Sequence, residues 1–315
     1  IPACKWVKLA ADRQLADLKT YAGSRSPYVF DENEANRVCK FIELLTHTKG
    51  ELAGTRIHLE PWQVFILTTV FGWLRRADGG RRYRRAYVEV SRGNGKSTLC
   101  SGIGLYCLLA DREGGAEVYS FATTRDQAKI VFGDAKVMAE RNAALRQKFG
   151  LQVLANALYV PQTNSTFQAK SAEGSTLDGL NTHLAIIDEL HAHKTRAVYD
   201  VVETSTGKRK NSLMFVITTA GFDTSGICYE VRTMVTKVLE KSVVDETQFG
   251  IIYGLDEGDD WTTVEALEKA NPNWGISVRP EIITSLMKKA IALPSAVNNF
   301  KTKHLNIWCS ASAAW

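Results

Sequence analysis

The chain has 315 residues, of which 45% are hydrophobic and 23% are charged, and its formal net charge at pH 7 is +5. This composition is typical of a folded domain with a sizeable core and excludes a disordered or low-complexity chain. No apolar run approaches the ~20 residues of a membrane-spanning helix, so we expect no membrane partner. The six cysteines are scattered without a Cys-x-x-Cys pair, which favours reduced thiols. The modest positive charge permits a polyanionic partner without requiring one.

The N-terminal part of the chain is expected to be mostly helical. Residues 31–34 begin a segment whose apolar positions follow helical spacing, and Pro61 stands at the expected first turn of a later helix. A short arginine-rich stretch follows, comprising Arg75, Arg76, Arg81, Arg82, Arg84 and Arg85. Two interpretations of this stretch stay open: a solvated hairpin or loop, and a surface that contacts phosphates.

The next segment has the order of a phosphate-binding loop. Residues 86–90 predict a strand, a glycine-rich turn follows, and a helix is expected from Lys96 to Leu109. Free N–H groups at a helix N-terminus attract anions, and Gly93 and Gly95 permit positive φ angles. The motif is nevertheless irregular, because Val90 stands where the pattern G-x-x-x-x-G-K-[ST] has its first glycine.

Further apolar strands alternate with helical segments along the chain. We expect strands at 117–122, 183–187, 213–217 and 249–253, a helix capped by residues 123–124, and an antiparallel pair at 158–161 and 165–169. This alternation predicts an α/β fold whose mostly parallel sheet is flanked by helices. Turn residues and a short helix at 280–291 predict a small C-terminal subdomain beyond residue 253.

The apolar strand at 183–187 ends in two adjacent carboxylates, Asp188 and Glu189. Phosphoryl transfer needs a metal to neutralise charge and a group that orients the nucleophile, and these two residues could supply both functions. The alternative is that they cap the next helix. Following a Lys-Ser-Thr loop, the pair predicts a phosphate-loop NTPase in which Lys96 contacts the β- and γ-phosphates and Ser97 binds Mg²⁺.

Three further groups of polar residues are candidates for a functional site. His191 and His193 could belong to a zinc site, but no third ligand is suitably spaced, and we favour a surface loop. Thr218 and Thr219 end a strand, where they could hydrogen-bond the catalytic Glu or the γ-phosphate, or merely form a turn. Gln63 could pair with adenine through its amide.

At these positions the chain resembles the large terminase subunit of tailed bacteriophages in its ATPase half, most closely the branch typified by phage HK97. The matching segments are residues 54–63, 91–97, 122–128, 187–189, 218–221 and 271–274. The family's ATPase loop has Ser or Pro followed by Arg in place of the first glycine. The irregular Ser91-Arg92 start therefore agrees with this family.

The resemblance implies a role for each matching residue. It implies an ATPase core of the additional-strand, catalytic-glutamate (ASCE) type, with ATP and Mg²⁺ as cofactors. The implied ATP-binding residues are Trp62, Gln63, Ser91, Arg92, Gly93, Asn94, Gly95, Lys96, Ser97 and Thr98. Glu189, Lys96 and the cis arginine Arg92 are the implied catalytic residues. Ser97 and Asp188 hold the metal, and Thr218 and Thr219 couple hydrolysis to movement.

The chain departs from the family pattern in two respects. Many relatives carry an arginine where this chain has Asp178, and that arginine may act across the subunit boundary in them. Arg196 and Arg209 are candidates for the trans-acting arginine here. Family members also continue into a nuclease domain, which we expect to be absent from this chain. We divide the chain into an N-terminal helical segment packing on the ATPase core (1–60), the core (61–253) and a lid or linker subdomain (254–315).

The function implied by the resemblance is an ATP-hydrolysing motor that translocates double-stranded DNA into a procapsid. The implied partners are the portal protein, the procapsid, the small terminase subunit and further copies of the chain. These copies would form a pentameric ring when working, although the chain could be a monomer in solution. The expected location is the cytoplasm of the host cell. Two alternatives stay open: a helicase-like DNA-dependent ATPase, and a nucleotide-controlled adaptor with negligible turnover.

Overall fold

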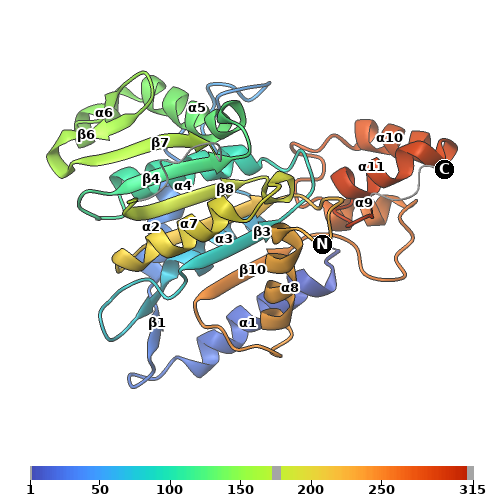
Figure 1. Ribbon diagram of the computed structural model, residues 1–315, viewed down its shortest axis with the longest axis horizontal. Helices are drawn as coiled ribbons and strands as arrows, with labels where there is room; N and C mark the ends of the chain where they lie inside the picture. The colour runs from blue at the N-terminus through green and yellow to red at the C-terminus, as the bar shows by residue number, and fades with distance from the viewer. Residues whose placement is uncertain (1, 172–178, 311–315) are drawn as a thin grey trace.

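The centre of the computed structural model is an eight-stranded sheet in the order β10–β3–β9–β8–β4–β7–β6–β5 (Figure 1). The structure describes residues 2–171 and 179–310. The strands are β3 (Arg85–Glu89), β4 (Glu117–Ala122), β5 (Gln152–Val153), β6 (Leu158–Val160), β7 (Ser165–Ser171), β8 (Thr182–Asp188), β9 (Leu213–Thr218) and β10 (Gln248–Ile252). All neighbouring pairs from β10 to β7 are parallel, and β6 pairs antiparallel with both β7 and β5. The predicted mostly parallel sheet is therefore confirmed.

The strand order also confirms the expected type of ATPase core. Strand β9 lies between β3, which leads into the phosphate loop, and β8, which ends in the two carboxylates. This intervening strand is the additional strand of the predicted class. Because all these strands are parallel, their carboxyl ends meet at one edge, where open α/β sheets bind ligands.

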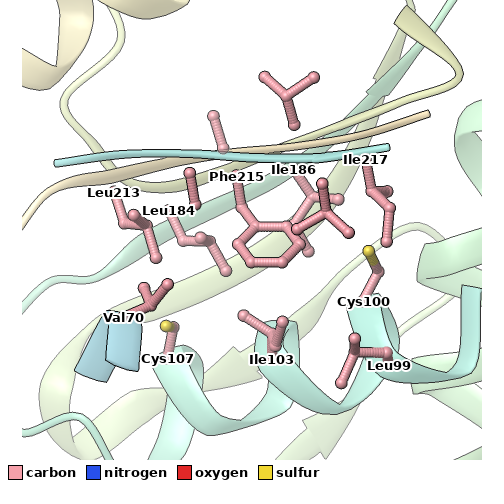
Figure 2. Packing of buried hydrophobic residues seen from close by; sticks show 14 of the residues in the cluster. Val70, Leu99, Cys100, Ile103, Cys107, Leu184, Ile186, Leu213, Phe215 and Ile217 are labelled. Carbon is pink, nitrogen blue, oxygen red and sulfur yellow. The ribbon is translucent and has the colours of Figure 1, made fainter. Parts of the chain in front are cut away.

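Helices cover both faces of the sheet. One face is covered by α2 (Glu32–Ile42), α3 (Pro61–Gly72), α4 (Lys96–Leu109) and α5 (Arg125–Arg141), and the other by α7 (Ala197–Ser205) and α8 (Ile227–Leu239) (Figure 1). Figure 2 shows Ile103 of α4 and Val70 of α3 directed toward Phe215 and Leu184 of the central strands. Every residue of β8, β9 and β10 is buried, as expected for strands covered on both faces.

The remaining elements surround this core. They are α1 (Lys5–Thr20), β1 (Tyr28–Phe30), β2 (Trp73–Arg75), α6 (Ala143–Phe149), the short 3₁₀ turns η1 (Pro161–Thr163), η2 (Leu190–Ala192) and η3 (Thr206–Lys208), and the C-terminal helices α9 (Val264–Ala270), α10 (Pro280–Ala292) and α11 (Pro294–His304). Helix α1 packs against β10 and α8. No helix in residues 2–171 or 179–310 is long and apolar enough to cross a bilayer.

The helix starts follow the local signals in the sequence. The Asp31 carboxylate accepts hydrogen bonds from the N–H groups of Asn33 and Glu34 at the start of α2. Pro61 opens α3. The Thr124 hydroxyl accepts a hydrogen bond from the N–H of Gln127 at the start of α5. These side chains satisfy N–H groups that have no partner within the first turn of a helix.

Both interpretations of the arginine-rich stretch were wrong for its buried members. Arg82 is 1% exposed, pairs with Asp17 and Glu246, and lies over the rings of Tyr28 and Trp73. Arg81 is 4% exposed, and its guanidinium pairs with Asp111 and donates to the main-chain oxygen of Asn211. Acceptors from distant parts of the chain thus occupy these side chains, which are neither solvated nor available to phosphates.

The buried apolar residues form two clusters. The larger extends from Ala10 of α1 to Tyr253 after β10 and includes the sheet. The smaller joins α9, α10 and α11 through Leu267, Ala270, Val278, Ile283, Met287, Ala290, Phe300 and Leu305. These helices lie at one end of the molecule, beyond the carboxyl ends of the strands (Figure 1). The division at residues 60 and 253 stays a prediction.

Candidate active site

The phosphate loop connects β3 to α4 with the backbone geometry expected from its glycines. Gly93 and Gly95 have φ angles of 86° and 72°, in the left-handed region that favours glycine. Gly95 is also the N-cap of α4, and no side chain caps that helix. The N–H groups of the first turn of α4 are therefore available to an anion, which the helix dipole favours at this end.

Lys96 is 8% exposed and lies against the loop. Its Nζ donates to the main-chain oxygens of Val90 and Ser91 at 3.2 and 3.3 Å. Burial lowers the pKa of Lys96, while the nearby charges of Glu189 and Asp188 oppose this effect. The ammonium group thus lies between the loop and the two carboxylates.

Replacing Lys96 with Met is expected to weaken nucleotide binding. A hydrogen bond to a charged group contributes about 1.5–3 kcal/mol, so affinity should fall roughly ten- to a hundredfold. Calorimetric titration with ATP measures this change, and Lys148→Met on α6 is the control for loss of a surface lysine. An unchanged affinity for Lys96→Met would contradict the assignment.

Asp188 and Glu189 emerge at the carboxyl end of β8, as predicted. Asp188 is 7% exposed, and its Oδ1 accepts no hydrogen bond from the described residues. Burial and the adjacent Glu189 charge raise the pKa of Asp188 to about 6. An orphaned, buried carboxylate oxygen next to a phosphate loop is the type of ligand that Mg²⁺ prefers, so this site fits the ion.

Glu189 has a φ angle of 52°, an uncommon conformation for a residue other than glycine. Burial alone would raise its pKa, but the hydrogen bond from His191 and the positive charge of Lys96 outweigh it and lower the pKa to about 2. The pKa values of the two adjacent carboxylates are therefore shifted in opposite directions, that of Glu189 downward and that of Asp188 upward.

These residues line a cleft of about 780 Å³. Its lining includes Arg92, Gly93, Gly95, Lys96, Ser97, Thr98, Asp188, Glu189 and His191. An adjoining hollow of about 660 Å³ contains Gln63 and shares Lys49, Gly95 and Thr98 with the cleft. Together they form an elongated groove that could take phosphates at the carboxylates and a base near Gln63. Thr98, one of the implied ATP-binding residues, lines both parts.

Three residues implied to bind ATP have side chains that brace the loop instead of lining the groove. Ser91 Oγ donates to the main-chain oxygen of Ala270 at 2.9 Å, and Asn94 Nδ2 donates to Asn271 Oδ1 at 2.9 Å. Trp62 Nε1 donates to Asn273 Oδ1 at 2.5 Å. All these partners lie at or just after the end of α9. The side chains of Ser91, Asn94 and Trp62 therefore tie the loop and α3 to the C-terminal helices.

Gln63 lines the hollow beside the cleft, and part of the hydrogen-bonding capacity of its amide is used at the start of α3. Its Oε1 accepts a hydrogen bond from the N–H of Glu60 at 3.0 Å in the capping box of α3. The amide NH₂ and the second lone pair of Oε1 are left for a base.

Thr219 and His191 contact the Glu189 carboxylate, and Thr218 contacts His191. His191 Nδ1 lies 3.0 Å from Glu189 Oε2 and 3.1 Å from Thr218 Oγ1. Thr219 Oγ1 lies 3.5 Å from the same carboxylate oxygen. The expectation of a surface loop was wrong for the histidines, because the side chain of His191 is 10% exposed and His193 is 7% exposed.

Neither histidine belongs to a group with metal-ligand geometry in the described parts of the chain. The one such group there, Cys107, Asp111 and His183, lies at the opposite end of the strands. Its carboxylate is already occupied by Arg81. The structure therefore gives the zinc interpretation of the histidines no support.

The two candidate trans arginines differ in availability. Arg209 is 9% exposed in its side chain and is bonded to Glu113 and to main-chain oxygens near the start of β4, away from the cleft. It is therefore not free to reach a neighbouring subunit. Arg196 is 55% exposed in its side chain and pairs with Asp200 and Glu230, so it stays a candidate. Asp178 lies outside the described residues.

Sequence reasoning missed three residues of the site. His191 was noted but assigned to the surface, although its place two residues after Glu189 was a usable signal. Asn273 lies in a turn that matched the family, yet no role was assigned to it. Lys303 of α11 carried no local signal, and only the fold brings its Nζ to 3.2 Å from His191 Nε2.

These features define the class of protein: a phosphate-loop ATPase core with an additional strand and a carboxylate pair at the β8 end. The chain belongs to the family of the terminase large subunit, ATPase domain, whose sequence profile matches residues 61–237. It is 49% identical to Protein YmfN of Escherichia coli K12 over 138 residues, covering 44% of this chain and 30% of that protein. It is 27% identical to the terminase large subunit of Enterobacteria phage HK97 over 274 residues, covering 86% of this chain and 52% of that protein.

Solved structures agree with this assignment. The crystal structure of the HK97 bacteriophage large terminase matches with a TM-score of 0.75 at 26% identity, covering 87% of this chain and 55% of that chain. The ATPase domain of the Thermus phage P74-26 large terminase shares the fold, with a TM-score of 0.50 at 21% identity over 84% of this chain. The chain spans about half the length of the HK97 relative and less of YmfN.

Proposed function

We propose that this chain is the ATP-hydrolysing motor domain of a phage terminase large subunit and translocates double-stranded DNA into a procapsid. The observation that carries this proposal is the convergence of Lys96, Asp188 and Glu189 in one cleft at the start of α4. This arrangement supplies the parts that phosphoryl transfer needs, namely positioning, charge neutralisation and a group that orients water.

Each group of residues in the cleft has its own role in hydrolysis. The first turn of α4 and Lys96 hold the β- and γ-phosphates, and Arg92 presents a positive charge at the same cleft. Ser97 and Asp188 would hold Mg²⁺, which neutralises phosphate charge when bound. Glu189 accepts a proton from the attacking water or orients it, and its depressed pKa keeps it ionised for this role.

The contacts of the loop support a route from hydrolysis to movement. The N–H of Arg92 donates to the main-chain oxygen of Lys303 at 2.9 Å, and Ser277 Oγ donates to the main-chain oxygen of Gly93 at 2.6 Å. Together with the Ser91 contact, these bonds join the phosphate loop to α9 and α11 and to the turn before α10. Thr219 contacts the catalytic carboxylate directly, and Thr218, the last residue of β9, contacts His191, which lies against the same carboxylate. A change at the phosphates would therefore shift the C-terminal helices against the sheet.

The proposal extends to the partners implied by the family resemblance. They are duplex DNA, the portal protein, the procapsid, the small terminase subunit and further copies of the chain in a pentameric ring, all in the host cytoplasm. A motor must ignore base sequence, so its DNA contacts are with phosphates, and its affinity for DNA falls steeply with salt.

The function is tested by displacement of a third DNA strand from a blunt triplex in the presence of ATP. We expect displacement that depends on ATP hydrolysis, with turnover raised by duplex DNA. Separation of the strands of a tailed duplex without triplex displacement would favour the helicase-like alternative. Tight ATP binding without turnover, with DNA and portal present, would favour the adaptor.

A further inference from the structure

A line of polar contacts runs from a C-terminal helix to the catalytic carboxylate. Lys303 Nζ lies 3.2 Å from His191 Nε2, and His191 Nδ1 lies 3.0 Å from Glu189 Oε2. The side chain of His191 is 10% exposed, so the line is largely shielded from solvent. Lys303 belongs to α11, whereas the other two residues follow β8. The contacts therefore connect two parts of the fold.

The chemistry of these contacts determines which nitrogen of His191 carries the proton. A lysine ammonium has three donors and no acceptor, so Lys303 donates to His191 Nε2, which must offer its lone pair. The proton of the neutral imidazole then lies on Nδ1, where it donates to Glu189. Hydrogen bonds in such a series polarise one another, so the bond from Lys303 to His191 and the bond from His191 to Glu189 strengthen each other.

The surroundings of Nδ1 agree with this assignment. Thr218 Oγ1 donates its proton to the main-chain oxygen of Thr219 at 3.0 Å. Because the hydroxyl proton is used in this bond, Thr218 Oγ1 can only accept a hydrogen bond from Nδ1, which lies 3.1 Å away. The backbone N–H of His191 also donates to Thr218 Oγ1 at 3.2 Å, which fixes the ring next to β9. Nδ1 also lies 3.4 Å from Thr219 Oγ1, whose proton is directed to the main-chain oxygen of Ala220 at 3.1 Å. Glu189, Thr218 and Thr219 therefore all face Nδ1 as acceptors and favour a proton on it.

Lys303 is tied to the nucleotide loop as well. Its main-chain oxygen accepts the N–H of Arg92, and its Nζ lies 5.7 Å from the centre of the Phe222 ring, which follows the coupling threonines. Movement of α11 would therefore change the distance between Nζ and His191. Loss of this donor removes one of the two causes that place the proton on Nδ1, so the population with that proton falls and the bond that holds Glu189 weakens.

We propose that His191 is the positioning residue of Glu189 and that Lys303 fixes its tautomer, so that the location of α11 determines whether the catalytic carboxylate is held in place. This inference rests on the proposed ATPase function of Glu189. It assigns the C-terminal subdomain a defined chemical input to the active site, in addition to its backbone contacts with the loop.

The first test observes the tautomer directly and needs no turnover. Long-range ¹H–¹⁵N correlation spectra of the ¹⁵N-histidine-labelled chain distinguish Nδ1–H from Nε2–H rings, and His191→Asn identifies the signal. We expect Nδ1–H for His191 in the parent chain and a shift of population to Nε2–H in Lys303→Met. An Nε2–H ring in the parent chain, or an unchanged ring in Lys303→Met, would overturn the inference.

The second test is a double-mutant cycle on ATP turnover. We expect kcat to fall roughly ten- to a hundredfold in His191→Ala and less in Lys303→Met, with the affinity for ATP within about twofold of the parent. In the His191→Ala background, Lys303→Met should have no further effect, because the two residues act through one contact. Additive losses, or losses in ATP affinity alone, would indicate a merely structural role.

Matched controls separate this inference from the proposed function. Lys301→Met removes a lysine of the same helix whose Nζ lies 4.9 Å from the centre of the Trp261 ring, and it should leave kcat unchanged. His191→Asn keeps a donor near the position of Nδ1 and should recover part of the turnover lost in His191→Ala.

A parent chain with the Nδ1–H ring but no turnover with DNA and portal present would refute the proposed function and leave the tautomer assignment standing.

Discussion

Replacing Glu189 with Gln is expected to abolish ATP hydrolysis and to leave nucleotide binding close to that of the parent chain. Gln has nearly the same shape but carries no charge and cannot accept a proton from water. General-base catalysis contributes roughly 10²–10⁴-fold, so turnover should fall by that order. Phosphate release under saturating ATP measures turnover, and calorimetric titration measures binding.

The control for this variant is Glu203→Gln on α7, which removes a carboxylate that pairs with Arg85. We expect its turnover to equal that of the parent. Because the pKa of Glu189 is lowered to about 2, a loss of activity in mildly acidic buffer would not report its protonation. Parent-like turnover in Glu189→Gln would show that another group orients the water.

Much of the fold could be predicted because its signals are local. The helix starting at Lys96 has the predicted bounds, and the strand predicted at 183–187 is longer by one residue at each end, since a glycine turn and an apolar run determine these elements directly. The parallel order of the sheet brings their ends together. For this reason the sequence also indicated that Lys96, Asp188 and Glu189 would share one site.

The parts that could not be predicted depend on partners far away in the sequence. Arg82 is buried because Asp17 and Glu246, from other elements, neutralise it, and no local pattern encodes this pairing. In the same way, the contact between His191 and Lys303 exists only once α11 lies at the carboxyl ends of the strands. The family resemblance likewise assigned roles to Ser91 and Asn94 but did not show that their side chains face away from the cleft.

The second large effect is a loss of folding stability, expected from a substitution at the end of the sheet opposite the candidate nucleotide cleft. Asp111 accepts hydrogen bonds from Arg81 at 2.8 and 2.6 Å and contacts His183 Nε2 at 2.7 Å. Arg81 is 4% exposed, so Asp111→Asn would leave a buried guanidinium without its counter-charge. Removing one partner of a buried pair costs about 3–5 kcal/mol, and we expect the free energy of unfolding to fall by this amount.

Urea unfolding measures this loss as a lower midpoint at an unchanged slope. Asp200→Asn is the matched control, because the side chains of Arg196 and Asp200 are 55% and 44% exposed and such pairs contribute about 1 kcal/mol or less. Equal losses of unfolding free energy in Asp111→Asn and Asp200→Asn would contradict the claim that burial makes the Arg81–Asp111 pair more important for stability. Binding of ATP should survive in both variants under native conditions, since neither residue lines the cleft.

The same cluster predicts a dependence of stability on pH. Burial alone would raise the pKa of Asp111, but the charge of Arg81 and the hydrogen bond from His183 outweigh it, and the pKa lies below its ordinary value of 3.8. A carboxylate with a depressed folded-state pKa contributes stability above its unfolded value, and this contribution is lost as the pH falls toward the folded value. The difference in unfolding free energy between the parent and Asp111→Asn should therefore be constant near neutral pH and shrink below about pH 4. A difference that grows on acidification would show that the protonated acid is the form that stabilises the fold.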